Sequence, residues 1–408
     1  MSKKRANGEG SISKRADGRY MARFTVNHKQ RSIYGHSYEE VRQKLTEKLY
    51  EIATNTYIEP CKDTVGAWLR EWLVTYALPT VKQSTYISYE GYVRLHLEPE
   101  FGSHKLTALT TEQIQRFFNK KSKGSNGVKG LSAKTLRNIY NMFSAALEQA
   151  VINRKLIRNP LHGVKLPKVV KKEIAILEPS EQTALHAAAE RSEELPAFGI
   201  IFTLSTGVRL GELLGLQWSD LDYSKHTIHI RRTVGRLQKI DEDGNLLTKT
   251  NGRNSTEITV RTPKSPASYR EIPLFDALWH GLMEYKQRQK SLFEALGSER
   301  NPNGFIFCTL SGKVYDPRTY EDLFKRMLKA AGIKNINFHA LRHTFATRAL
   351  EAGMDVKVLS TILGHTQAST TLNLYAHALS DHKRSSMEKM CAFYNTTSDT
   401  NAEGVVNC

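Results

Sequence analysis

The sequence predicts a multidomain protein with three folded parts. These are a small α+β module with a three-stranded sheet plus one helix, an all-α helical domain, and a mainly α domain with a small antiparallel sheet. The chain has 408 residues, of which 40% are hydrophobic and 25% charged, so several globular domains are expected. Strand-like alternation is concentrated in residues 12–35 and 226–273, whereas apolar residues at helical spacing dominate elsewhere. Connections near residues 55–62 and 160–175 separate the parts.

Residues 1–58 make the first part. The runs SISKRADGRYMARFTV and KQRSIYGHS predict short strands, with turn signals at Asp17-Gly18 and Asn27-His28. The stretch from Tyr38 to Ile52 predicts an amphipathic helix, because its apolar residues recur at helical spacing. Basic residues accumulate along the strands, at Arg15, Arg19, Arg23, Lys29 and Arg31. A small basic sheet backed by one helix can lie in a DNA major groove, and a merely solvated face is the alternative.

Residues 63–162 are expected to form four helices around a shared core. Cap and proline signals set the boundaries: after Thr64, from Ser84 to Pro99, from Thr110 with Gln113 as a capping box, and from about Ser132 to before Pro160. The aromatic residues lie on the apolar helix faces, so we interpret them as core and not as a base-stacking platform. We expect DNA contacts from lysines in and after the loop KKSKGSNGVKG, namely Lys121, Lys123, Lys129 and Lys134.

The net charge is concentrated in the first half of the chain. The whole sequence carries 59 Lys and Arg against 41 Asp and Glu, a net charge of +18. Residues 1–171 hold 30 basic and 14 acidic residues, a net charge of +16, and residues 172–408 hold 29 and 27, a net charge of +2. A basic front half joined to a nearly neutral back half indicates a polyanionic partner, for which a merely basic, soluble surface is the alternative.

Secreted and membrane proteins are not expected from this sequence. No run approaches the roughly 18 consecutive apolar residues of a membrane span, and the basic N-terminus has no apolar stretch behind it. The four cysteines are far apart and lack metal-type spacing, so we interpret them as reduced thiols of a cytoplasmic protein: Cys61, Cys308, Cys391 and Cys408.

The third part, residues 173–393, is expected to be mainly helical with one β feature. The runs HTIHIRRTV, EITVRT and YREIPL, between residues 226 and 274, each alternate like a strand. Residues 394–408 are mostly polar, and we expect them to be a disordered tail.

Six residues of this third part carry chemistry in a recognisable order. They are Arg209 in TGVRLGEL, Lys264 in TPKS, His339 and Arg342 in HALRHT, His365 in LGH, and Tyr375 in TLNLYAH. Arg209 falls on a turn that opens a helix, and the spacing of His339 and Arg342 places both on one helical face. Singly, each of the six is as consistent with a surface charge, a cap or half-buried packing.

Together, in this order and with these flanks, the six residues resemble the signature of the tyrosine recombinase, or phage integrase, family. The chain is similar to that family over nearly its whole length, and in particular to integrases of conjugative transposons and temperate phages. The resemblance implies an arm-type DNA-binding domain at residues 1–58, a helical core-binding DNA domain at 63–162 and a catalytic tyrosine recombinase domain at 173–393. It also implies site-specific recombination through a 3′-phosphotyrosine intermediate and a Holliday junction, as integrase or excisionase activity of a mobile element or prophage.

The resemblance also assigns roles that suit the chemistry. Tyr375 is the nucleophile, with Arg209 and Arg342 stabilising the phosphorane-like transition state as permanently charged forks. Lys264 protonates the leaving 5′ oxygen, His339 assists proton transfer at Tyr375, and His365 hydrogen-bonds a non-bridging oxygen. Glu212, beside the first arginine, is expected to orient it.

No cofactor is expected, neither ATP nor a metal. His226 and His229 are three apart on an expected strand, so they point to opposite faces and are poorly placed to share an ion. The stretch GEGSIS near the N-terminus lacks the lysine-serine pair of a phosphate-binding loop.

The expected partners are double-stranded DNA, at arm-type and core-type attachment sites, and further copies of the chain in a homo-tetramer on DNA. Accessory DNA-bending or excision factors are further candidate partners. The segment from His382 to Phe393 is a candidate for contact between protomers, and packing of this helix on its own domain is the alternative. A type IB topoisomerase shares the same active-site logic and is one alternative. A catalytically silent DNA-binding protein is another.

Overall fold

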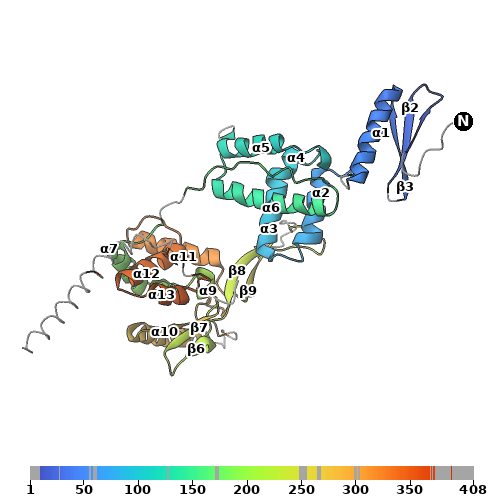
Figure 1. Ribbon diagram of the computed structural model, residues 1–408. Coiled ribbons are helices and arrows are strands. Elements are labelled where there is room, and N and C mark those ends of the chain that lie inside the picture. Colours follow the sequence, from blue (N-terminus) through green and yellow to red (C-terminus); the bar gives the residue numbers. More distant parts are fainter. Residues whose placement is uncertain are drawn as a thin grey trace, which may run out of the picture. The chain divides into compact units, whose positions relative to one another are not determined.

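The computed structural model describes residues 10–26, 28–54, 57, 62–125, 128–170, 174–247, 255–263, 268–297, 301, 304–367, 369, 371, 372 and 387 (Figure 1). The chain divides into two compact units. The first comprises Met1–Val170 with Glu242–Asn245, and the second comprises Lys171–Asp241 with Leu246–Cys408. Among the described residues, no helix is long and apolar enough to cross a membrane.

The first unit begins with the predicted three-stranded sheet and helix. Strands β1 (Ser11–Lys14), β2 (Tyr20–Val26) and β3 (Lys29–Gly35) pair antiparallel in that order. Helix α1 (Tyr38–Ala53) starts where the Ser37 side chain accepts a hydrogen bond from the Glu40 amide. Alternate residues of β2 point at the helix, and Ala22, Phe24 and Val26 form the core with Val41 and Leu45. The α+β prediction for this module is confirmed.

Four helical stretches follow, as the sequence predicts. Helix α2 (Val65–Trp72) continues through a π-helical turn at Leu73–Ala77, and α3 (Gln83–Tyr92) through one at Val93–Leu97 into α4 (Glu98–Phe101). Helices α5 (Thr111–Lys123) and α6 (Ala133–Ile152) flank the short strands β4 (Gly124–Ser125) and β5 (Val128–Lys129). The predicted caps are present at Thr64, Thr110 and Ser132, with both bonds of the Thr110–Gln113 capping box. The predicted start after Ser84 is wrong, because α3 already begins at Gln83, and its N-cap Lys82 makes no capping bond with its side chain. The aromatic core is confirmed by the burial of Trp68, Trp72, Tyr86, Phe117, Phe118 and Phe143.

The predicted end of the second helix at Pro99 is wrong. Pro99 lies in the first turn of α4, and the helical chain runs on to Phe101. In a regular α-helix a proline ring collides with the carbonyl four residues earlier, here that of Leu95. Leu95 lies within the π-helical turn, whose wider spiral relieves this collision and lets the helix pass the proline.

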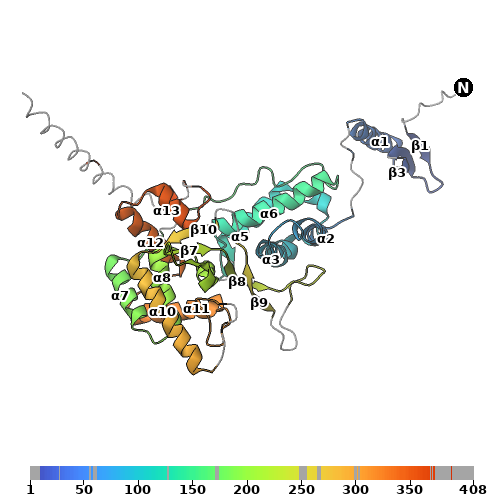
Figure 2. The ribbon, with the colours of Figure 1, turned by 90° about the horizontal axis from the view of Figure 1, so that it is seen from below.

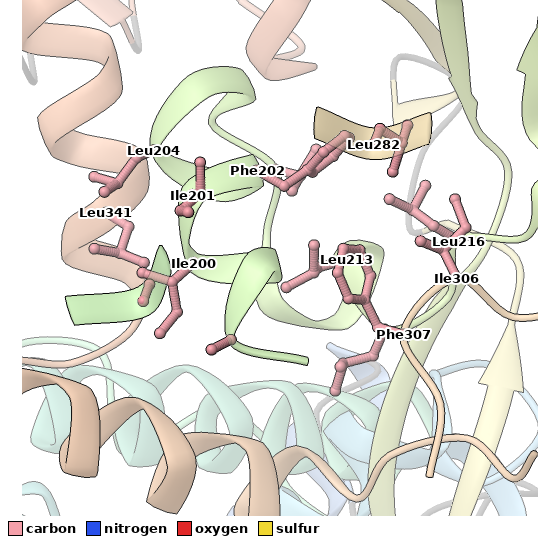
Figure 3. Packing of buried hydrophobic residues seen from close by; sticks show 14 of the residues in the cluster. Ile200, Ile201, Phe202, Leu204, Leu213, Leu216, Leu282, Ile306, Phe307 and Leu341 are labelled. Atoms are coloured by element: carbon pink, nitrogen blue, oxygen red, sulfur yellow. The ribbon is translucent and has the colours of Figure 1, made fainter. Parts of the chain in front are cut away.

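The second unit is built around one apolar helix. Helix α8 (Phe198–Thr206) is hydrophobic on nearly every side, and such a helix is stable only inside a core. Figure 3 shows its side chains between residues from α9 (Leu210–Leu213), α10 (Asp276–Ala295) and α12 (His339–Glu351). Helices α7 (Pro179–Glu190), α11 (Pro317–Ala330) and α13 (Val356–Leu363) complete this part. The mainly α prediction is confirmed.

The β feature of this unit is small and antiparallel, as predicted, but it is divided. Strands β6 (Leu221–Asp222), β7 (Thr227–Ile230) and β10 (Arg270–Pro273) form one sheet in the order β10-β7-β6. Strands β8 (Thr233–Gln238) and β9 (Thr256–Arg261) form a separate hairpin (Figure 2). The run HTIHIRRTV is therefore two strands, broken at residues 231–232.

A buried carboxylate accounts for that break. Asp220 is only 1% exposed, and Arg232 donates to it at 2.6 Å while Arg231 lies 3.7 Å from its other oxygen. A charged group so deeply buried requires paired cations. Both arginines turn toward Asp220, and the strand ends there.

Candidate active site

Arg209 is positioned by a sharp turn between two helices. Helix α8 ends at Gly207, whose φ of +67° is left-handed and whose added Cβ would lie 2.4 Å from Phe345 Cδ1. Glycine is the residue that tolerates this conformation and this contact. The chain then re-enters a helix with Arg209 as the N-cap of α9, so the prediction of an arginine on a turn that opens a helix is confirmed.

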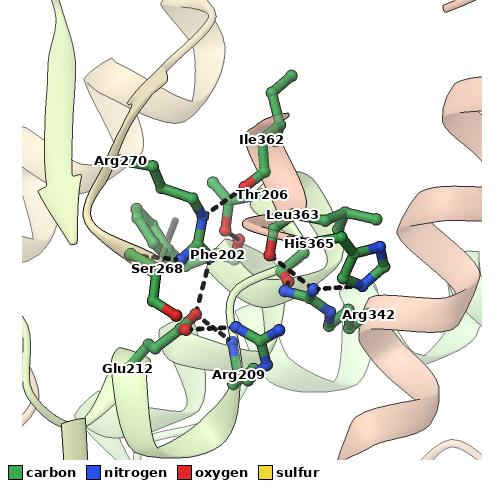
Figure 4. Close-up of polar contacts among 11 residues, drawn as sticks. Phe202, Thr206, Arg209, Glu212, Ser268, Arg270, Arg342, Ile362, Leu363 and His365 are labelled. Carbon is green, nitrogen blue, oxygen red and sulfur yellow. Dashed lines mark hydrogen bonds and ion pairs between the residues drawn. The ribbon is translucent and has the colours of Figure 1, made fainter. Parts of the chain in front are cut away.

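Glu212 connects two arginines beneath this turn (Figure 4). Its Oε1 accepts from Arg209 Nη1 at 2.7 Å, and its Oε2 accepts from the Arg209 backbone amide at 3.0 Å and from Arg270 Nη2 at 2.7 Å. The carboxylate is 4% exposed and the Arg270 side chain 3%. Burial acts to raise the Glu212 pKa, but the hydrogen bond and charge of Arg270, followed by the charge of Arg209, bring it down to about 2. Glu212 is therefore ionised throughout the physiological range.

Arg270 is a site residue that our sequence reasoning missed. It begins β10, in the run YREIPL, and shares the inward face with the buried Ile272 two residues later. That alternation was a usable signal, because it places the arginine on the core side, where a charge requires a partner.

Arg342 lies on α12, where His339 is the first helical residue. Its guanidinium donates to the Gly207 carbonyl at 2.9 Å, to the Leu363 carbonyl at 2.6 Å and to His365 Nε2 at 2.9 Å (Figure 4). The residue is only 1% exposed. Arg342 therefore ties the turn before Arg209 to the end of α13, and brings two separate parts of the predicted signature together.

His365 follows the C-terminus of α13, where Gly364 adopts a left-handed conformation. An arginine has no acceptor, so His365 Nε2 accepts the bond from Arg342. The imidazole is then neutral with its proton on Nδ1, which lies 2.7 Å from Thr371 Oγ1 and donates to it. Burial, followed by the charges of Arg342 and Arg209, lowers the His365 pKa to about 4.

His339 also favours the neutral form. Burial lowers its pKa, and the charges of Arg342 and Arg209 lower it further, against an opposing effect of Glu212. Its ring meets the edge of the His343 ring, with centroids 4.6 Å apart. Burial, His339 and Arg342 lower the pKa of His343 to about 4. Because the His339 ring is neutral, one of its nitrogens carries a lone pair that can accept a proton.

Four of the six predicted residues thus gather in one place: Arg209, His339, Arg342 and His365. Lys264 and Tyr375 lie outside the described residues. Described residues four positions from each of them do reach the site, because the Ser268 carbonyl accepts a bond from Arg270 and the Thr371 hydroxyl one from His365. Three guanidiniums, neutral imidazoles and one carboxylate leave an excess of positive charge, which is suited to binding a phosphate and stabilising its transition state.

The predicted DNA-contact residues of the first unit lie on different faces. Arg15, Arg19 and Arg23 are exposed. Arg23 pairs in register with Ser32 on the open face of the sheet, which also carries Tyr34, whereas Arg31 pairs with Phe24 on the helix-facing side and is half-buried. Arg31 is therefore not part of the open basic face.

The predicted lysines extend from the end of α5 to the first turn of α6. Lys121 is half-buried over the Phe117 ring, and three others are exposed at the end of α5, on β5 and in the first turn of α6: Lys123, Lys129 and Lys134.

Two histidines that the sequence raised as metal candidates are placed in the structure. His226 precedes β7 and stacks on the Trp279 ring at 4.3 Å, and His229 lies within β7. Within the described ranges, no group of three or more His, Cys, Asp or Glu side chains is arranged to hold a metal ion.

Comparisons with known proteins show which sequences and folds the chain is similar to. A family model described as the phage integrase family matches residues 175–382, and one described as a phage integrase N-terminal SAM-like domain matches residues 64–122. A protein named tyrosine recombinase XerC-like, from Caldanaerobacter subterraneus subsp. tengcongensis, is 29% identical over 371 residues, covering 88% of this chain and 91% of the relative.

Two solved structures share the fold. The integrase of transposon Tn1549 in complex with a circular intermediate DNA has a TM-score of 0.62 at 23% identity, over 81% of this chain and 100% of that chain. A lambda integrase tetramer bound to a Holliday junction has a TM-score of 0.52 at 19% identity, over 88% and 96% of the two chains.

Proposed function

Because the chain belongs to the phage integrase family, and is therefore a tyrosine recombinase, we propose how its own residues carry out site-specific recombination of a mobile element or prophage. The reaction cuts and rejoins DNA through a 3′-phosphotyrosine intermediate and a Holliday junction. The observation that supports this proposal most strongly is the gathering of Arg209, Arg342 and His365 at the turn after α8, where the buried Glu212 holds Arg209 and Arg342 binds both the Gly207 carbonyl and His365.

The arginines stabilise the negative charge that develops on the scissile phosphate. Attack by Tyr375 turns the scissile phosphodiester into a five-coordinate transition state with added negative charge on its non-bridging oxygens. Arg209 presents its guanidinium from a fixed turn, because Glu212 holds both its side chain and its backbone amide. Arg342 adds a second charge from the interior. Preorganised charges of this kind stabilise the transition state without reorganising during the reaction.

Proton transfers complete the step. The Tyr375 hydroxyl gives its proton to neutral His339, its oxygen bonds to phosphorus, and the bond from phosphorus to the 5′ oxygen breaks. Lys264 protonates that leaving oxygen, so the products are a 3′-phosphotyrosine and a free 5′ hydroxyl. Religation is the reverse reaction with a hydroxyl from the other duplex. One phosphodiester replaces another, so neither ATP nor a metal ion is consumed.

The N-terminal module and the rest of the chain bind different DNA sites. Residues 1–58 bind arm-type sites through the open face of the sheet, where Arg23 is exposed. Residues 63–162 and 173–393 bind the crossover site as the helical and catalytic domains, and the exposed lysines near α5 contact backbone phosphates. The enzyme works in the bacterial cytoplasm, with accessory DNA-bending or excision factors as further partners.

The active assembly on DNA is a homo-tetramer. Each protomer supplies one tyrosine, and exchange between two duplexes requires four cuts. The lambda integrase, whose fold is similar, has been solved as a tetramer on a Holliday junction. The segment from His382 to Phe393 lies outside the described residues except for Met387, and we propose that it contacts the neighbouring protomer.

The test uses a nicked duplex from the junction DNA of the element that encodes the chain. Wild type is expected to form a covalent adduct and, with two intact sites, recombinant products, with EDTA present throughout. Tyr375→Phe is expected to bind the same DNA without an adduct. Relaxation of supercoils without recombination would support a topoisomerase instead, and binding without any adduct in wild type would indicate a silent DNA-binding protein. Loss of cleavage in EDTA would contradict the metal-free step.

A further inference from the structure

Arg270, the first residue of β10, connects three segments of the active site. We propose that it is a positioning residue for strand cleavage, which holds Glu212 against Arg209 and ties this pair to the end of α13 that carries His365. The inference rests on the proposed function, because it takes Arg209 and His365 to act at the scissile phosphate.

The three arms of the guanidinium reach different parts of the chain (Figure 4). Nη2 donates to Glu212 Oε2 at 2.7 Å, Nη1 to the Ser268 carbonyl at 3.2 Å, and Nε to the Ile362 carbonyl in the last turn of α13. Residue 362 is three residues before His365, and residue 268 is four residues after Lys264. A planar fork is pre-organised for such divergent acceptors, whereas a lysine ammonium is not.

The contacts of Arg270 place it to act through other groups. Its side chain is 3% exposed, and its three guanidinium nitrogens all donate to protein acceptors, one of which is the carboxylate that holds Arg209. Glu212 holds Arg209 through one bond to its side chain and one to its backbone amide. The position of Arg209 therefore depends on Glu212 being ionised and fixed.

Arg270 is the stronger of the two partners that keep Glu212 ionised. The charged or titratable groups that act with Glu212 are Arg209 from α9, Arg270 from β10 and His339 from α12. Without Arg270, the burial of Glu212 raises its pKa, and a protonated Glu212 no longer binds Arg209 as a charge-assisted acceptor. Cleavage by an Arg270 variant must then depend on pH in a way that wild-type cleavage does not.

The experiment measures single-turnover formation of the covalent adduct at saturating full-length protein, on the nicked junction duplex, with DNA affinity measured in parallel. Arg270→Met is expected to slow cleavage on the order of 100-fold, as small misplacements of reacting groups do, with little change in DNA affinity. Arg270→Lys keeps the charge but not the fork, so it is expected to be slowed without acquiring a new pH dependence.

The matched control is Arg348→Met. Arg348 also donates to a backbone carbonyl and a carboxylate, those of Leu177 and Glu351, and it makes neither of these bonds to a site residue. It is expected to lower thermal stability while leaving the cleavage rate near that of wild type.

The pH dependence separates positioning from a merely structural role. For Arg270→Met, we expect burial to hold the folded-state Glu212 pKa above its unfolded value, so the stability that the protonated carboxyl contributes is lost as the pH rises. The ratio of variant to wild-type cleavage rate should do the opposite and increase with pH, because ionised Glu212 again holds Arg209. In the double variant Arg270→Met/Glu212→Gln, both trends should disappear while cleavage stays slow.

Three outcomes would overturn the inference. The first is a cleavage rate of Arg270→Met equal to that of wild type, and the second is a relative cleavage rate of this variant that falls together with its stability as the pH rises. The third is a loss of cleavage rate in Arg348→Met as large as that in Arg270→Met. If wild type itself forms no adduct, the proposed function fails. The stability titration still tests the Arg270–Glu212 pair in that case, and a flat difference between wild type and Arg270→Met across pH would refute it.

Discussion

Replacing Arg342 by methionine tests whether this site residue also stabilises the fold of its domain. Methionine keeps an unbranched apolar stem but removes the donors to the carbonyls of Gly207 and Leu363 and to His365 Nε2. Those acceptors belong to the turn after α8 and to the end of α13. The variant therefore leaves three acceptors without their donor in a place where Arg342 is 1% exposed.

The expected loss in the free energy of unfolding follows from these three bonds. Each buried acceptor left without a donor costs about 1–3 kcal/mol. Part of that cost is offset, because the variant no longer has to bury a charged guanidinium. We expect a loss of about 3 kcal/mol, comparable to the cost of breaking a buried ion pair. For a folding unit of 150–250 residues this corresponds to a melting temperature lower by about 6–12 °C.

The assay is thermal and urea unfolding of the full chain, followed at several pH values. Arg342 lowers the pKa of both His339 and His365, so wild type loses stability from these histidines as the pH falls below about 6.5. In Arg342→Met these histidine pKa values should lie higher, so the variant loses less stability as the pH falls. The difference in the free energy of unfolding between wild type and variant should therefore narrow on acidification.

A surface pair provides the control for this prediction. Arg326 donates to Glu194 at 2.6 Å with both side chains exposed, so Arg326→Met should cost less than about 1 kcal/mol. A change of under about 2 °C in Arg342→Met, or a stability difference that grows as the pH falls, would refute the reasoning.

Four further predictions follow from the site and the sheet. Gly207→Ala should lose about 2–4 kcal/mol in urea unfolding, because its φ is +67° and the new Cβ meets Phe345; an unchanged midpoint would contradict this. Arg209→Ala should slow adduct formation about 10²–10³-fold with little change in melting temperature, since Glu212 keeps Arg270; a wild-type rate would remove Arg209 from the mechanism. The rate of wild-type cleavage should show no titration of His365 until the pH approaches about 4, because the imidazole stays neutral above that pH. A midpoint at about 6.5 in the pH–rate profile that disappears in His365→Gln would belong to His365 and would contradict the lowered pKa. Arg23→Ala should weaken footprints at arm-type sites and spare the crossover site, and equal loss at both would place the arm-binding face elsewhere.

Local signals predicted most of the fold. A threonine followed three residues later by glutamine specifies a helix start through two short-range bonds, and the capping box at Thr110 formed as expected. The end of the second helix could not be predicted in the same way. Whether Pro99 breaks the helix depends on the π-helical turn before it, and that turn leaves no clear local pattern in the sequence.

Long-range contacts explain what was missed. The break in HTIHIRRTV depends on the buried Asp220, a partner that strand alternation does not reveal. The catalytic motifs predicted the four described residues that gather, Arg209, His339, Arg342 and His365, but not that Arg270 supports Glu212 from 58 residues away. The inward alternation of Arg270 with Ile272 predicts burial, and only the folded structure identifies the carboxylate that pairs with it.

The central claim is tested most directly by identifying the residue that becomes joined to DNA. Wild-type protein is reacted with the nicked junction duplex, the adduct is digested with protease and nuclease, and the linked peptide is sequenced by mass spectrometry. We predict a single peptide with a 3′-phosphate ester on Tyr375 and a free 5′ hydroxyl on the released strand. A linkage to any other residue, a 5′-phosphate linkage, or cleavage without a covalent intermediate would contradict the account.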